Sequence, residues 1–366
     1  MRNSYPAEQA AALVDQARLR QKAVVKFGPM AQKMLFLDEA LQQASGQAIA
    51  GYRAQRYESF EHVADLGCGI GGDAIALQAH GKQLLAFDLD PIRVCFAEYN
   101  LRVANKTTDF EVMIADWTTY GFSSPIQAAF ADPTRRINGR RVFSLHQMQP
   151  PLSAILALRQ QLPHVGVKVM PGVRYTELPP ECEVEWITEG GTCKEAVLWF
   201  GELRSDVARR ATILQKASER SICAQTLTSH GVASQTMITR PRAFLWEPDP
   251  SVIRATLVKT LAYELKASQL DGQIAYLTSE EARPTPFARC WPVIEDAPFH
   301  LKTLKRRLRH LDAHVVAVKK RGSPIDPERF RRRLKSNPKG RPVTVFISKY
   351  EGKAWMIICG EEIKRS

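Results

Sequence analysis

A glycine-rich turn after a short apolar run is the strongest chemical signal in the sequence. The run Val63–Leu66 leads into Gly67, Gly69 and Gly71, and a helical pattern follows. Glycines at such positions let the backbone bend sharply and approach a ligand closely. A phosphate-binding turn reads G-x-G-x-x-G, whereas this one reads G-x-G-x-G and has Asp65 two residues before its first glycine. An acid there would repel a pyrophosphate and suits a ligand that carries a positive charge.

Two more acids follow the next two apolar runs. Asp88 lies 17 residues beyond Gly71, close to the spacing of about 20 residues at which an acid meets a ribose diol. Asp116 can accept a hydrogen bond from an adenine amino group, and Leu89 and Trp117 provide apolar surface beside these acids. Together with the glycine-rich turn, these residues predict a site for S-adenosylmethionine, with S-adenosylhomocysteine as the product.

A fourth apolar run ends in the residues that we expect to face the reactive methyl group, because ligands sit at the carboxyl ends of the strands in such sheets. Asp132 can accept a proton or a hydrogen bond from the target atom, and the backbone carbonyl of Pro133 can assist. Arg135 and Arg136 can hold a substrate phosphate; alternatively, Arg135 pairs with a core carboxylate. Lys168 follows at the same rim, and we also expect it to contact substrate.

The order of apolar runs predicts an α/β fold. Nearly continuous apolar runs that alternate with helical patterns are typical of a parallel sheet covered on both faces. A hairpin is expected next, because Gly190 and Gly191 lie between two further strands at 183–188 and 195–200. Such a sheet is that of Rossmann-like class I methyltransferases. The five predicted parallel strands are 62–66, 83–88, 111–115, 128–132 and 165–170.

The positive charge of the chain gathers near its end. The net charge is +13, and residues 300–350 hold 16 Lys and Arg against 3 Asp and Glu, so the remainder is neutral. We predict helices at 301–311 and 327–335 and strands at 315–318, 343–348 and 354–359, after a single helix at 251–266. A basic excess of this kind is typical of a surface that binds a polyanion, although it can also be a solvated face without a partner. The predicted phosphate-binding residues are Lys302, Lys305, Arg306, Arg309, Lys319, Lys320, Arg321, Arg332 and Arg333.

The chain resembles a bacterial family of class I methyltransferases that carry a C-terminal THUMP-like domain. This resemblance implies S-adenosylmethionine as methyl donor, a ferredoxin-like segment at 241–288 and a THUMP-like domain at 289–366, after a helical extension at 1–58 and the methyltransferase domain at 59–240. THUMP domains accompany RNA-modifying enzymes, so the resemblance also implies RNA. It is carried by Asp65–Asp73, Asp132–Arg136, Gly139–Phe143, Lys168–Gly172, Lys194–Gly201, Glu247–Asp249, Ile274–Ser279, Lys319–Gly322 and Asp326–Leu334.

The N-terminal helices and core are also distantly similar to trimethylguanosine synthase, through Lys26-Phe27 and the turn at 65–73. Enzymes that methylate exocyclic amines place Pro-Pro-aromatic after the acid, whereas this chain has Pro133-Thr134-Arg135. The departure argues against methylation of a base amine and against a guanosine cap.

These observations predict a methyltransferase that acts on RNA. The alternatives are a methyltransferase for a protein or a small molecule, and a non-catalytic protein that binds S-adenosylmethionine and RNA. Seven scattered cysteines without metal spacing, and the lack of a secretion signal, predict reduced thiols in the cytoplasm and no metal site. No run is long enough for a membrane helix. The sequence does not determine the oligomeric state, and a monomer is compatible with it.

Overall fold

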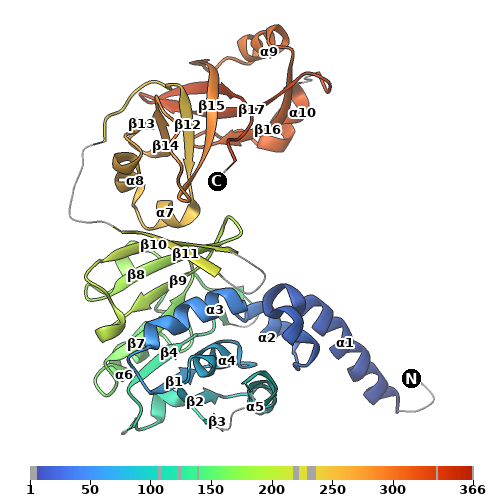
Figure 1. The fold of residues 1–366 in the computed structure, drawn as a ribbon, viewed down its shortest axis with the longest axis vertical. Helices are drawn as coiled ribbons and strands as arrows, with labels where there is room; N and C mark the ends of the chain where they lie inside the picture. Colours follow the sequence, from blue (N-terminus) through green and yellow to red (C-terminus); the bar gives the residue numbers. More distant parts are fainter. Residues whose placement is uncertain are drawn as a thin grey trace. The chain divides into compact units, whose positions relative to one another are not determined.

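The computed structural model describes residues 6–105, 109–122, 125–137, 140–216, 222–228, 236–334 and 337–364. The chain divides into two compact units, which are residues 1–208 with 214–224 and residues 209–213 with 225–366 (Figure 1). Within these ranges, no helix combines the length and the apolar character that crossing a membrane requires.

A nine-stranded sheet forms the centre of the first unit, in the order β11-β10-β8-β9-β7-β4-β1-β2-β3. The strands from β7 to β3 are parallel, and β9 runs antiparallel to both β7 and β8. The predicted parallel strands and the terminal hairpin at Gly190 are therefore confirmed. Two further strands, β10 and β11, continue the sheet beyond the hairpin. The bounds are β1 His62–Leu66, β2 Gln83–Asp88, β3 Phe110–Ile114, β4 Ala128–Ala131, β7 His164–Val169, β8 Glu183–Glu189, β9 Thr192–Trp199, β10 Arg209–Lys216 and β11 Ile222–Thr228.

Helices pack on this sheet as the alternating sequence pattern predicts. They are α4 Gly72–Ala79, α5 Pro91–Asn105 and α6 Leu152–Leu158, with the short 3-10 helices η3 Trp117–Thr119, η4 Tyr175–Glu177 and η5 Gly201–Leu203. Asp90 accepts a hydrogen bond from the backbone N–H of Ile92 at 2.9 Å and caps the start of α5. The segment after β4 returns as a short hairpin of β5 Arg136–Ile137 and β6 Arg140–Arg141.

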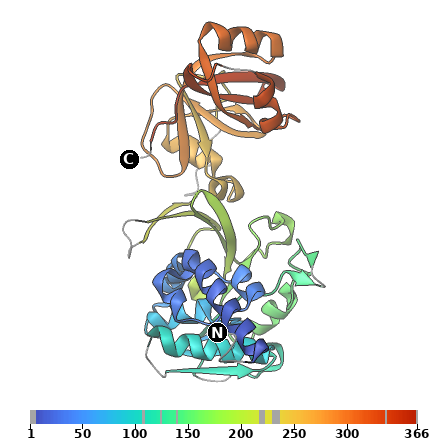
Figure 2. The same cartoon turned by 90° about the vertical axis from the view of Figure 1, so that its right-hand side faces the viewer.

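The N-terminal extension is helical, with short breaks. It comprises α1 Ala7–Phe27, η1 Gly28–Gln32, α2 Asp38–Gln43, α3 Gln47–Ala54 and η2 Gln55–Tyr57. Figures 1 and 2 show these blue helices beside α4 and α5. Phe27 and Ile49 belong to the same buried cluster as Ile75 on α4 and Leu101 on α5. The extension therefore shares the core of the sheet domain.

A seven-stranded sheet organises the second unit, in the order β13-β14-β12-β15-β18-β17-β16. β15 pairs with β12 on one side and with β18 on the other, so one sheet runs through both of the segments expected at 241–288 and 289–366. The division of this unit at residue 288 stays an interpretation of the sequence. The bounds are β12 Phe244–Pro248, β13 Ser268–Asp271, β14 Ile274–Ser279, β15 Ala288–Pro298, β16 Ala313–Lys320, β17 Arg341–Tyr350 and β18 Lys353–Cys359.

Two helices replace the single helix predicted at 251–266. They are α7 Pro250–Arg254 and α8 Val258–Glu264. Thr256 adopts a φ of 59° between them, in the left-handed region that a continuous helix excludes. Asp249 caps α7 by accepting from the backbone N–H of Ser251 at 2.9 Å.

The basic helices α9 Leu301–His310 and α10 Pro327–Leu334 cover one face of this second sheet. Leu304, Leu308, Phe330 and Leu334 are buried against Val345 of β17 and its neighbours. Alternate residues of the strands face the other side, where an aromatic cluster contains Tyr276, Trp291, Phe346 and Trp355. Because the apolar stripes of both helices are buried, their basic residues lie on the outward side.

Candidate active site

The glycine-rich turn joins β1 to α4, and its backbone requires glycine. Gly67, Gly69 and Gly71 have φ values of 90°, 56° and 87°, a region that residues with a Cβ rarely enter. A Cβ on Gly67 would also lie 3.3 Å from the carbonyl oxygen of Asp132. The turn is therefore held close to the end of β4, where the chemistry is predicted.

Asp65 lies buried just before this turn. Its exposed fraction is 1%, and neither carboxylate oxygen has a hydrogen-bond partner among the described residues. Burial, with added repulsion from Asp73 and Asp132, raises the pKa of Asp65 well above its usual value. An uncompensated carboxylate of this kind is costly unless a cation joins it.

The raised pKa of Asp65 gives a pH dependence of stability. Between the usual value of 3.8 and the raised pKa, the folded state binds the proton that the unfolded state has lost, so the free energy of unfolding falls as pH rises. We expect the thermal midpoint of the wild type, measured relative to Asp65→Asn, to fall as pH rises through this window. A difference between the two midpoints that stays constant with pH would contradict the expectation.

Asp88, at the end of β2, holds the glycine-rich turn in place. One carboxylate oxygen accepts from the backbone N–H of Gly69 at 2.9 Å, and the other accepts from that of Asp90 at 3.0 Å. Leu89 follows and is 69% exposed. Asp88 thus has a structural role within the chain, in addition to the ligand contact that the sequence predicts.

Asp116 comes two residues after β3 and caps η3. Its Oδ1 accepts from the backbone N–H of Thr118 at 2.9 Å and from the Thr118 hydroxyl at 2.7 Å. Trp117 is 6% exposed, while Ile114 at the end of β3 is 61% exposed. Exposed Leu89 and Ile114 provide apolar surface at the ends of two adjacent strands.

Asp132 follows β4 directly and forms an ion pair that sequence reasoning missed. Its Oδ2 lies 2.6 Å from Nζ of Lys168, which is a residue of β7. The side chain of Lys168 is 6% exposed and that of Asp132 is 24% exposed. Lys168 is therefore buried behind Asp132. Arg135 is partly buried, and the side chain of Arg136 is outside the described residues.

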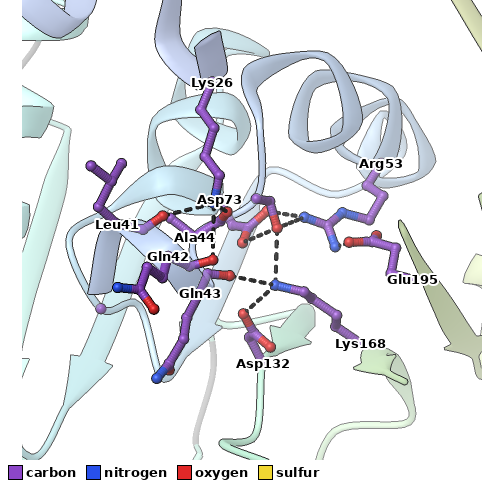
Figure 3. A network of polar contacts seen from close by, with 12 residues as sticks. Lys26, Leu41, Gln42, Gln43, Ala44, Arg53, Asp73, Asp132, Lys168 and Glu195 are labelled. Carbon is purple, nitrogen blue, oxygen red and sulfur yellow. Dashed lines mark hydrogen bonds and ion pairs between the residues drawn. The ribbon is translucent and has the colours of Figure 1, made fainter. Parts of the chain in front are cut away.

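Residues of the N-terminal extension surround this ion pair (Figure 3). Nζ of Lys168 also donates to Oγ of Ser45 at 3.1 Å. Arg53 of α3 is 2% exposed and pairs with Asp73 of α4 and with Glu195 of β9, the latter at 2.6 Å. No local pattern in the sequence indicates a role for Arg53 or Ser45, because their partners are distant along the chain.

Lys26 is one of the residues in which the chain is similar to trimethylguanosine synthase. Its side chain binds main-chain carbonyls close to Ser45. Its Nζ donates to the carbonyls of Leu41 at 2.7 Å, Gln42 at 3.0 Å and Ala44 at 2.7 Å. Partial burial lowers the pKa of Lys26 to about 8, with smaller contributions from Lys168 and Lys194. Lys26 thereby ties the end of α1 to the turn that carries Ser45.

The predicted basic residues of the second unit fall into two groups. Lys319 and Arg321 both pair with Glu247, the second pair at 3.8 Å, and lie over the rings of Trp291 and Tyr276. Lys319 and Lys320 end β16, two residues beyond the end of the strand predicted at 315–318. The exposed group comprises Lys302, Arg306 and Arg309 of α9, Lys320, and Arg332 and Arg333 of α10, while Lys305 is partly buried.

The strand order, the antiparallel hairpin next to β7 and the glycine-rich turn after β1 define the class I methyltransferase fold. A crystal structure of a candidate methyltransferase from Porphyromonas gingivalis W83 shares this fold, with a TM-score of 0.79 at 20% identity over 98% of this chain and 92% of that chain. The model of the family described as THUMP domain-like matches residues 288–361.

Curated relatives define the family. An uncharacterised S-adenosylmethionine-dependent methyltransferase of Mycobacterium tuberculosis is 34% identical to this chain over 355 residues, covering 93% of each protein, and it matches equally in strains CDC 1551 and H37Rv. The chain belongs to this family of S-adenosylmethionine-dependent methyltransferases. Its cofactor is S-adenosylmethionine, as the sequence predicts.

Proposed function

We propose that this methyltransferase acts on RNA, which it docks through α9 and α10. The exposed basic residues of these helices carry the proposal, because the helices lie in the THUMP-like region of a chain that also holds the cofactor turn. Lysine and arginine side chains free to meet phosphates give affinity without reading sequence.

The cofactor supplies an electrophilic methyl group on a cationic sulfonium. We assign the ammonium of its methionine part to Asp65, whose buried oxygens lack a partner among the described residues. Asp88 would meet the ribose, and its bonds to Gly69 and Asp90 place it beside the turn. The adenine would lie among Asp116, Leu89 and Trp117. Oδ1 of Asp116 caps η3, so Oδ2 would accept the hydrogen bond from the adenine.

Asp132 would orient the target atom by accepting its hydrogen bond or proton. Its carboxylate is partly exposed, at the end of the strand beside β1, and the carbonyl of Pro133 follows it in the chain. Methyl transfer needs mostly positioning, because the leaving group already carries a positive charge. Arg135 and Arg136 would hold the phosphate next to the target.

The exposed basic group provides the test of RNA docking. The triple change Lys302→Gln, Arg306→Gln and Arg309→Gln on α9 should weaken binding of a fluorescein-labelled RNA hairpin. The slope of log Kd against log salt should fall by about two units, because each lost phosphate contact removes about 0.7–0.9 of slope. Fluorescence anisotropy at several salt concentrations measures both quantities.

A matched control removes three exposed charges from the first unit, with Arg18→Gln, Lys22→Gln and Arg102→Gln. We expect this variant to bind the hairpin as the wild type does. Equal weakening in both variants would mean that net charge alone drives binding. Binding insensitive to salt would favour a protein or small-molecule substrate.

The cytoplasm is the compartment that we propose. No disulfide joins any of the cysteines in the part of the chain that the structure describes, and reduced thiols are usual in a reducing compartment.

A further inference from the structure

Lys168 has no N–H left for a substrate. An ammonium group offers three donors. In this structure Nζ donates to Oδ2 of Asp132 at 2.6 Å, to Oγ of Ser45 at 3.1 Å and to the carbonyl of Gln43 at 3.4 Å. With its side chain 6% exposed, Lys168 is placed to hold neighbouring groups.

The hydroxyl group of Ser45 likewise uses all of its hydrogen-bonding positions within the chain. A hydroxyl has one donor and two acceptor positions. Oγ of Ser45 accepts from Lys168 at 3.1 Å and from Nη2 of Arg53 at 2.7 Å, and it donates to Oδ2 of Asp73 at 3.4 Å. Ser45 is 5% exposed. One serine of the N-terminal extension thus links the lysine behind Asp132 to the first turn of α4.

We propose that Lys168 is a positioning residue for Asp132 and that the turn at residues 43–45 completes the active site. The inference rests on the proposed role of Asp132 in methyl transfer. Lys168 binds one oxygen of the carboxylate and fixes the side-chain rotamer. The other oxygen can then face the target atom in a single orientation.

This arrangement gives the N-terminal extension a role in the reaction. The turn at 43–45 is itself fixed by Lys26, which donates to Leu41, Gln42 and Ala44 (Figure 3). A chain of contacts therefore runs from α1 through the turn and Lys168 to Asp132. Loosening the turn should release Asp132 although no residue of the turn touches the target.

Methyl transfer to RNA from cells that lack the protein tests the positioning role. Lys168→Met should lower kcat by about 10²-fold, because a displacement of about 1 Å at a catalytic group has an effect of this size. The KM for S-adenosylmethionine should stay unchanged, and Lys168→Arg should recover part of the rate. Lys168→Met added to Asp132→Asn should cause no further loss, since Lys168 acts through Asp132.

Hydrogen exchange by mass spectrometry tests the contacts without any substrate. In Lys168→Met, amides at residues 43–47 and after Asp132 should exchange about tenfold faster, because the charge-assisted hydrogen bonds that Nζ makes to these segments are lost. Lys82→Met is the matched control, because Lys82 is also buried and its Nζ donates to the carbonyl of Glu58 at 3.0 Å. That variant should leave exchange at these residues, and kcat, unchanged.

The methyl-transfer assay and hydrogen exchange together distinguish a failure of the proposed function from a failure of the inference about Lys168. If the wild type methylates no RNA, the proposed function is wrong, and hydrogen exchange alone decides whether Lys168 holds Asp132 and the turn. Unchanged exchange in Lys168→Met would overturn the inference. A normal kcat in Lys168→Met would also overturn it. The same holds if adding Lys168→Met to Asp132→Asn lowers the rate as much as Lys168→Met lowers it in the wild type.

Discussion

Arg53→Met is expected to lower the free energy of unfolding of the first unit by about 3–5 kcal/mol, because breaking a buried ion pair leaves uncompensated charges. The guanidinium group is 2% exposed and pairs with Asp73 and Glu195. Burial alone would lower the pKa of Arg53, but the nearby acidic groups, Asp73 and Glu195 foremost, together outweigh burial and raise the pKa. Methionine keeps most of the volume and removes the charge.

Denaturant unfolding of the full chain measures this loss. The control is Arg102→Met, which removes an exposed pair with Glu98 at 2.6 Å on α5. An exposed pair contributes about 0.2–1 kcal/mol, so the control should unfold nearly as the wild type does. Equal destabilisation of the two variants would show that the buried network has no special role in stability.

Asp132→Ala is expected to reduce methyl transfer by about 10²–10⁴-fold, the usual contribution of a positioned proton acceptor. Its carboxylate is the partly exposed member of the pair with Lys168. The assigned cofactor contacts lie elsewhere, so binding of S-adenosylhomocysteine should remain close to that of the wild type. Radiolabelled methyl incorporation and calorimetry measure the two properties.

The surface variant Asp206→Ala serves as the control for this change, because Asp206 is exposed after β9. It should keep both activity and cofactor affinity. An Asp132→Ala variant that transfers methyl at the normal rate would show that another group orients the target atom.

The positions of the predicted cofactor residues follow from simple geometry. Asp88, Asp116 and Asp132 each come at or just after the end of a parallel strand, and such ends meet at one edge of the sheet. Alternation of apolar runs and helices was therefore enough to predict this edge. The sequence also identified the glycines that the turn requires, because only they adopt its positive φ values.

The network behind Asp132 could not be predicted in this way. Arg53 and its partner Glu195 are 142 residues apart, and Lys168 and Ser45 are 123 residues apart. Local patterns carry no information about such pairs. Lys168 was accordingly predicted as a substrate contact, because a lysine at a strand end gives no sign of a buried partner.

For the basic residues of the second unit, too, local sequence patterns do not reveal partners that are distant along the chain. Charge and helical spacing predicted a basic surface, and burial of Leu304 and Phe330 confirms which sides of α9 and α10 face outward. Lys319 belonged to the same predicted group, yet it pairs with Glu247, which is 72 residues earlier in the chain. Only the structure separates the exposed basic residues from those that hold the second unit together.

Nucleoside mass spectrometry of cellular RNA tests the proposed function most directly. RNA from cells that lack the protein is compared with RNA from the same cells carrying the wild type or Asp132→Ala. We predict a methylated nucleoside that disappears with the protein, returns with the wild type and does not return with the variant. Identical nucleoside profiles in all three samples would contradict an RNA substrate.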